Sequence, residues 1–202
     1  MNTIKNLAVS IATLSTLPRQ CIPELEMNAF LSHSLATASV AQFLAKEKLK
    51  IKDASDFFVA GLLHDFGKAV LAQFEAAAYQ KTLQTALEQQ VPLTEVEQRT
   101  FGTTSAEVGA LLAESWQFPE SLVSCIREHI HYTEDSSDLT IAVAAAKAIV
   151  QTMKIGNNGD PCIPVFSGIL KSRLDCEPED IIKQMRNLDA DVASLLVSVG
   201  GA

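Results

Sequence analysis

Residues 61–68 read Gly61-Leu62-Leu63-His64-Asp65-Phe66-Gly67-Lys68. The stretch places an imidazole beside a carboxylate at the end of an apolar helical pattern, so both side chains are predicted to face the interior. Gly67 can close the helix, because glycine readily adopts the left-handed conformation that follows a last turn. Gly61 lies one turn before Asp65 and would let another helix approach closely. The pattern predicts a helix that begins near Asp53 and presents His64 and Asp65 to the core.

A second histidine, His33, precedes this pair by 31 residues. It belongs to a helix predicted from about Glu26 to Lys48, on the face that also carries Phe30, Val40 and Leu44. A single inward histidine is usually a hydrogen-bonded core residue. Two histidines and a carboxylate, however, are costly to bury without partners. A metal ion, or hydrogen bonds among the three side chains, would relieve that cost.

The rest of the chain also follows a helical period, and no stretch alternates convincingly at period two. Thr94 with Glu97 is typical of a capping box, and Thr104 can cap the helix that follows. Trp116 is predicted to be a core or hinge anchor, and His131 a surface residue. The further predicted helices cover residues 4–17, 68–88, 94 onward, 105–116, 119–131, 139–153 and 177–195. We therefore expect an all-α fold in a single domain over residues 1–202, with a C-terminal helical extension over about 156–202.

Composition narrows the class of protein. The 202 residues are 48% hydrophobic and 20% charged, which is typical of a soluble globular domain. A net charge of −8 argues against nucleic-acid binding, which needs a basic face. Four cysteines without a Cys-x-x-Cys motif suit reduced thiols, and no apolar run is long enough to span a membrane. The N-terminal segment is better explained by an amphipathic helix than by a signal sequence. These features predict a cytoplasmic protein.

Several motifs together resemble the HD superfamily, and within it the HDOD domain, a bacterial relative of the HD-GYP cyclic-dinucleotide phosphodiesterases. The resemblance covers about residues 2–150. It implies an HD-domain-like helical bundle. The stretches that carry it, in their expected order, are residues 32–36, 60–68, 101–109, 116–120 and 126–129.

The chain departs from the catalytic pattern of that superfamily. The resemblance implies one histidine, an adjacent His-Asp pair and a last aspartate on a later helix. Here residues 144–147 read Ala-Ala-Ala-Lys, which puts Ala145 or Ala146 where that aspartate should be. Thr104 and Ser105 stand where an Asp-His pair is usual, and the Gly-Tyr-Pro signature is missing. A two-metal hydrolytic site would need more donors than remain.

The expected metal ligands are His33, His64 and Asp65, with His129 as a fourth if its helix turns it inward. We expect either no metal or one weakly held divalent ion, with iron or manganese the most suitable. In HD enzymes the lysine at the position of Lys68 is well placed to meet a substrate phosphate. In a degenerate site a solvated lysine at a helix start is the preferred interpretation. Asp65 and Lys68 would be catalytic only if the protein is an enzyme.

Three functions fit these residues. The first is a non-catalytic signalling or regulatory domain. It would bind a signalling protein or a small phosphorylated ligand in the cleft that corresponds to the active site of catalytic HD domains. The second is a metal-dependent phosphohydrolase that acts on a phosphomonoester or a nucleotide diester. The third is a structural scaffold in which the histidines and Asp65 only hydrogen-bond one another. The missing ligands favour the first.

Overall fold

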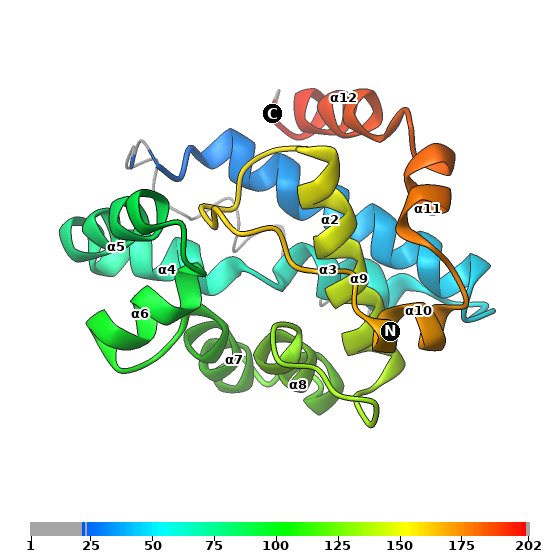
Figure 1. Cartoon of the computed structure of the whole chain (residues 1–202), viewed down its shortest axis with the longest axis horizontal. Helices are drawn as coiled ribbons and strands as arrows, with labels where there is room; N and C mark the ends of the chain where they lie inside the picture. The colour runs from blue at the N-terminus through cyan, green and yellow to red at the C-terminus, as the bar shows by residue number, and fades with distance from the viewer. Residues whose placement is uncertain (1–21, 23, 201–202) are drawn as a thin grey trace.

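The computed structural model describes residue 22 and residues 24–200, and these residues form helices and no β-strand (Figure 1). The all-α class is therefore confirmed. The amphipathic helix predicted over residues 4–17 lies outside the described residues. Among the helices that are described, none combines the length and apolar character that a bilayer crossing requires.

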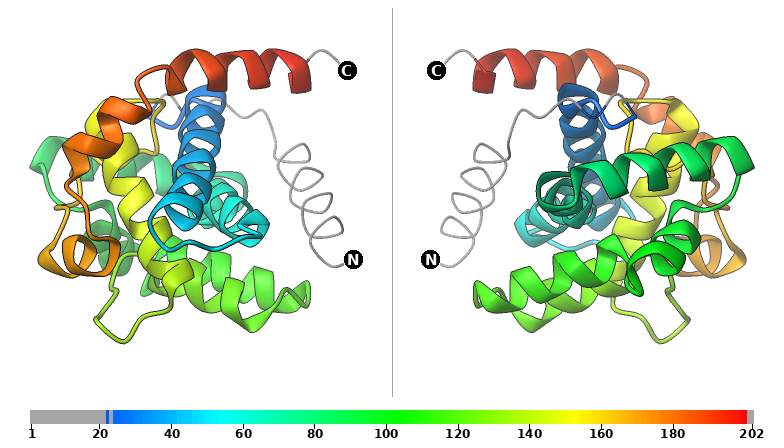
Figure 2. Two further views of the ribbon diagram at one scale, coloured as in Figure 1. Left: turned by 90° about the vertical axis from the view of Figure 1, so that its right-hand side faces the viewer. Right: turned by 90° about the vertical axis from the view of Figure 1, so that its left-hand side faces the viewer.

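Three helices form the centre of the bundle. Helix α2 (Met27–Glu47) packs along α3 (Ser55–Leu63) and α9 (Asp138–Met153). Figure 1 shows α5 and α6 at one end of the bundle, α10 and α11 at the other, and α7 and α8 along one side. Figure 2 shows α12 lying across the end of α2, which it contacts. The remaining helices are α4 (Phe66–Phe74), α5 (Ala76–Gln89), α6 (Leu93–Phe101), α7 (Ser105–Ser115), α8 (Glu120–Glu128), α10 (Gly168–Leu174), α11 (Pro178–Gln184) and α12 (Leu188–Gly200).

Side-chain caps explain where several helices begin. The carboxylate of Glu26 accepts hydrogen bonds from the backbone amides of Asn28 and Ala29 at the start of α2. Thr104 caps α7 as predicted, because its hydroxyl accepts from the amide of Glu107. Each cap satisfies amides that have no partner within the first turn of a helix.

The capping box expected at Thr94 and Glu97 is wrong. Helix α6 starts one residue earlier, at Leu93, and Pro92 precedes it without a side-chain cap. The carboxylate of Glu97 is buried instead, where it accepts hydrogen bonds from the hydroxyls of Tyr79 and Ser105. A tertiary role therefore replaces the local one.

Two predicted helices are each divided in the structure. Residues 68–88 form α4 and α5, which separate at Glu75 because α4 packs on α7 whereas α5 packs on α6. The last predicted helix, over residues 177–195, becomes α11 and α12. Helix α10 was not predicted. Periodicity identified the helical character of these segments but not their changes of direction.

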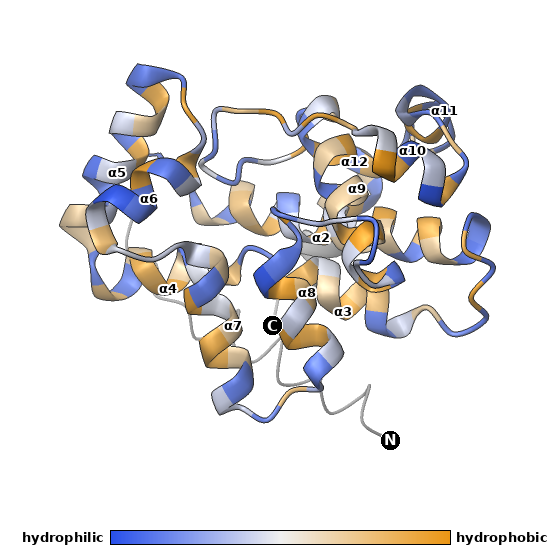
Figure 3. Cartoon of the chain, turned by 60° about the horizontal axis from the view of Figure 1, so that its bottom comes forward, coloured by the Kyte–Doolittle hydropathy of each residue, from blue (hydrophilic) through white to orange (hydrophobic). Residues whose placement is uncertain are grey.

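Among the described residues the core consists of two apolar clusters, and Figure 3 shows apolar stretches along the helices of the bundle. The larger cluster contains residues of α2, of α3 and of every helix from α7 through α12. The smaller cluster contains residues of α4, α5, α6 and the start of α2. His33 lies between Phe30, in the smaller cluster, and Ala36, in the larger one. Trp116 is 38% exposed and stacks on Phe66, so it covers the core rather than lying within it.

Two glycines allow helices to approach closely. A Cβ on Gly61 would lie 2.6 Å from the Cα of Ala38, which confirms the predicted close approach, here between α3 and α2. Gly67 does not end a helix as predicted. Helix α3 already ends at Leu63, and Gly67 lies in the first turn of α4 against the backbone of Ser105. The His-Asp pair therefore occupies the short junction between two helices.

Candidate functional site

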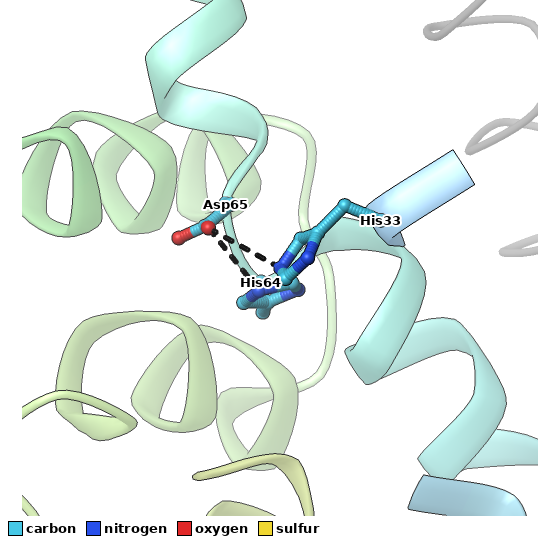
Figure 4. Close-up of side chains that lie close together, drawn as sticks. All are labelled: His33, His64 and Asp65. Carbon is cyan, nitrogen blue, oxygen red and sulfur yellow. Dashed lines mark ion pairs between the residues drawn. The ribbon is translucent and has the colours of Figure 1, made fainter. Parts of the chain in front are cut away.

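His33, His64 and Asp65 converge in the interior, as the sequence predicted (Figure 4). His33 projects from the middle of α2, and the other two residues form the junction between α3 and α4. The Nε2 atom of His64 lies 3.3 Å from Asp65 Oδ2, and that of His33 lies 4.0 Å from the same oxygen. One possible ligand atom from each residue lies within 4.8 Å of the others. The three side chains are therefore close enough together to hold a metal ion.

His129 joins this group from the end of α8. The helix ends at Glu128, before the predicted end at His131, and turns the His129 ring inward. Its ring centroid lies 5.2 Å from that of His64, and its Nε2 lies 3.5 Å from Asp65 Oδ1. His131 is exposed, as predicted.

Backbone carbonyls orient two of the imidazole rings. The Nδ1 atom of His64 lies 2.7 Å from the carbonyl oxygen of Gly61, and that of His129 lies 2.9 Å from the carbonyl oxygen of Ile126. A carbonyl only accepts, so Nδ1 carries the hydrogen in both rings and Nε2 is directed toward Asp65. Ligating histidines are commonly oriented in this way. His64 Nε2 is buried, and it has no hydrogen-bond partner among the described residues.

Lys68 is not the solvated lysine that the sequence favoured. Its side chain is buried, and its Nζ donates to Asp65 Oδ2 at 3.0 Å and to the carbonyl oxygen of Asn158 at 2.9 Å. Burial opposes the charge, but attraction to Asp65, Asp160 and Glu97 outweighs it and raises the pKa of Lys68. The ammonium group is directed into the protein rather than toward solvent.

Lys147 is the residue of α9 that reaches the site, and the sequence interpretation assigned it no role. Its Nζ donates to Asp65 Oδ1 at 3.0 Å and lies 3.4 Å from His129 Nε2. Burial lowers the pKa of Lys147, and repulsion from Lys68 adds to that effect while Asp65 opposes it. A lysine inside an almost entirely apolar helix was the available signal, because such a residue needs a buried partner.

Asn158 closes the site from the connector between α9 and α10. Its side-chain amide donates to Asp65 Oδ2 at 3.0 Å. The connector is fixed to α2 by a hydrogen bond from the amide of Asn157 to the carbonyl of Ala29, 2.9 Å long. The sequence showed this segment only as a break in the helical pattern. We call the buried group the Asp65 cluster: His33, His64, Asp65, Lys68, His129, Lys147 and Asn158.

Asp65 is the centre of this cluster. Burial alone would raise its pKa, but the interactions with His64, Lys147 and Lys68 outweigh burial and hold the pKa well below its usual value. Asp65 therefore stays ionised in the folded protein. No residue of the cluster is more than 4% exposed, and solvent approaches it from a hollow that His33 and Asn158 help to line.

We expect the folded state to lose stability as the pH falls from 7 toward 4. Burial, with repulsion from Lys147, lowers the pKa of His129 to about 4, and burial also holds the pKa of His33 well below its usual value. The folded state keeps these rings neutral, whereas the unfolded chain takes up protons below about pH 6.5. The stability is thus present above that pH and is lost as the pH falls toward the folded pKa. His129 alone should account for about 3 kcal/mol.

Urea unfolding at pH 7, 6 and 5 would measure this loss. His129→Gln should flatten the dependence of the unfolding free energy on pH. His131→Gln, which changes an exposed ring nearby, should leave the dependence as in the wild type. Asp65 adds to the loss only below about pH 4, because its folded pKa is depressed. Equal slopes in the wild type and His129→Gln would contradict the assignment of a buried neutral ring.

The fold is similar to that of several solved proteins. An HDOD domain protein of unknown function from Geobacter sulfurreducens superposes with a TM-score of 0.74 at 21% identity, covering 94% of this chain and 67% of its own. A candidate phosphohydrolase from Shewanella amazonensis gives 0.67 at 23% identity, covering 96% and 68%. A candidate signal transduction protein from Marinobacter aquaeolei gives 0.70 at 18% identity, covering 85% and 38%. At these identities the likeness establishes the fold.

The sequence itself establishes the family. Residues 1–132 match the HDOD domain, so this chain belongs to the HDOD domain family. An uncharacterized protein of Treponema pallidum is 28% identical over 100 residues, which are 48% of this chain and 20% of that protein. The chain thus matches about a fifth of that relative's length. Lys147 and Asn158 both lie beyond residues 1–132, which match the HDOD domain.

Proposed function

We propose that this protein is a non-catalytic HDOD-type signalling or regulatory domain that keeps part of an HD metal site. The observation that carries the proposal is the pairing of Lys147 with Asp65 inside a closed cluster. A hydrolytic site must expose its reacting groups to substrate and water. Here the only carboxylate of the predicted ligand set is occupied by two lysines and an amide.

The partner that we propose is a signalling protein or a small phosphorylated ligand, bound outside the closed cluster. A hollow of about 200 Å³ lies over the connector and is lined by His33, Gln151, Lys154 and Asn158, among others. Solved neighbours with the same fold include a candidate signal transduction protein and the MmoQ response regulator from Methylococcus capsulatus. These support a regulatory role. We further propose that residues 1–202 act as one domain in the cytoplasm, without nucleic-acid or membrane partners.

The second candidate function is a metal-dependent phosphohydrolase, and two observations favour it. The ligand atoms of His33, His64 and Asp65 lie close together, and a candidate phosphohydrolase shares the fold. With these residues and His129 as ligands, a bound metal would polarise a phosphoryl oxygen and activate water. Against this function, the ammonium of Lys68 is bonded to Asp65 and to the backbone of Asn158, so it is not free to bind a phosphate.

We expect no appreciable hydrolysis of generic phosphomonoesters, phosphodiesters or cyclic dinucleotides, even with added manganese or iron. Loss of one group that stabilises developing charge commonly costs about 3 kcal/mol, or about a hundredfold in rate, and several are missing here. The assay compares the metal-supplemented turnover of the wild type with that of the His64→Ala, Asp65→Ala double variant. A robust wild-type rate that vanishes in a folded double variant would make this protein an enzyme.

A further inference from the structure

We propose that the ammonium group of Lys147 takes, in this chain, the part that a metal ion takes in catalytic HD domains, and that it keeps divalent metal ions from the ligands around Asp65. The inference deepens the proposed function and rests on it. Its test therefore measures metal binding rather than turnover.

The first argument is the occupancy of the Asp65 oxygens. Oδ1 accepts from Lys147 Nζ at 3.0 Å. Oδ2 accepts from Lys68 Nζ and from the side-chain amide of Asn158, both at 3.0 Å. A carboxylate offers about four lone-pair sites, and most are already in use. A metal ion that bound Asp65 would have to displace at least one ammonium group that is itself buried.

The second argument is charge. Two buried ammonium groups bond one carboxylate, so the groups in direct contact within the cluster carry more positive than negative charge. Two further carboxylates act on the lysines from a distance and are held by other partners: Glu97 by Tyr79 and Ser105, and Asp160 by the amides of Leu93 and Cys162. A divalent cation beside Asp65 would be repelled by both lysines at short range, where burial leaves little screening. The wild-type cluster therefore does not fit a divalent metal.

The third argument is that the nitrogen ligands remain in place. Within the described part of the chain His64 Nε2 is buried without a hydrogen-bond partner, and the Gly61 carbonyl holds its ring in the orientation that a ligand needs. The ligand atoms of His33 and Asp65 lie within 4.8 Å of one from His64. The histidines are thus ready for a cation, and Lys147 is the side chain whose removal frees Asp65 Oδ1. Substitution of Lys147 alone should open the site to metal.

The test is titration of metal-free protein with Co²⁺, followed by calorimetry and by the visible absorption of the bound ion. The wild type should bind no ion in the cluster. Lys147→Asp removes the ammonium group and supplies a carboxylate from α9, and it should bind one equivalent with a Kd at least about a hundredfold below the highest Co²⁺ concentration at which the wild type shows no binding. Lys147→Met removes the charge without adding a ligand, and it should bind more weakly than Lys147→Asp but measurably above the wild type.

Two controls separate this site from the surface. Lys171→Met removes a half-exposed ammonium group that pairs with Glu177, and it should bind Co²⁺ no better than the wild type. Adding His64→Ala to Lys147→Asp should abolish the gained binding and its visible absorption. If Lys147→Asp does not fold, Lys147→Met carries the same comparison.

Either of two results would overturn the inference: wild-type binding as tight as that of the Lys147 variants, or a folded Lys147→Met variant that gains none. Tight binding by the wild type without turnover would leave the proposed function standing. Turnover by a wild type that binds no metal would overturn the proposed function and leave the inference about Lys147 standing. The two proposals therefore fail separately.

Discussion

Asp65→Ala is expected to lower the free energy of unfolding by about 3–5 kcal/mol, the cost of removing one partner from a buried ion pair. The substitution leaves the ammonium groups of Lys68 and Lys147 buried without a carboxylate. Lys68 would keep only the carbonyl of Asn158, and Lys147 only the nearby ring of His129. Urea unfolding at pH 7 would measure the loss.

A matched surface pair provides the control. Glu95 pairs with Arg99 one turn apart on α6, and both side chains are more than half exposed. Glu95→Ala should cost only about 0.3–0.5 kcal/mol. Adding Lys147→Met to Asp65→Ala should recover part of the loss, because one unpaired charge is then gone. If Asp65→Ala costs no more than Glu95→Ala, Asp65 does not hold the cluster together.

The expected size of this effect follows from the position of Asp65. Its two oxygens connect side chains from α4, α9 and the connector after α9, and the ring of His129 brings in α8. The carboxylate thus joins elements that belong to both apolar clusters. Such a centre can keep one arrangement of the helices without any bound ion.

Local patterns in the sequence predicted most of the helices and the three residues that meet in the core. The inward position of His33 could be predicted because α2 has apolar neighbours on the same face. The cap at Thr104 depends on chemistry within a few residues, and Gly61 could be recognised as a contact position because glycine has no Cβ. Features of this kind can be recognised before the packing of distant helices is known.

The lysines could not be placed in the same way. From Leu139 to Val150 every residue of α9 is buried, so no polar face shows which way Lys147 points. Lysine is usually exposed, so the sequence favoured an exposed Lys68; only its pairing with Asp65 explains why it is buried. Asn158 lies in the connector between α9 and α10, and the path of that connector depends on its contacts with α2. Each of these positions follows from tertiary packing.

Gly67→Ala is expected to destabilise the protein by about 3 kcal/mol or more, because extra atoms in a well-packed core force the backbone to shift. A Cβ at this position would overlap the carbonyl oxygen of Ser105 and lie 2.7 Å from the amide nitrogen of Gly109. Both are backbone atoms of α7, so no side chain can rotate to make room. Thermal and urea unfolding would measure the loss.

Gly168→Ala is the matched control, because it adds the same methyl group where no other atom of residues 22 and 24–200 lies within 4 Å. Gly168 is in the first turn of α10, where alanine should be neutral or stabilising by up to about 1 kcal/mol. The contrast tests why Gly67 is a glycine. A helix-ending role, as the sequence first indicated, would require a left-handed backbone, whereas Gly67 lies within the first turn of α4 and its φ is not positive. If Gly67→Ala proved as stable as Gly168→Ala, the close packing of α4 on α7 that positions Asp65 and Lys68 would be wrong.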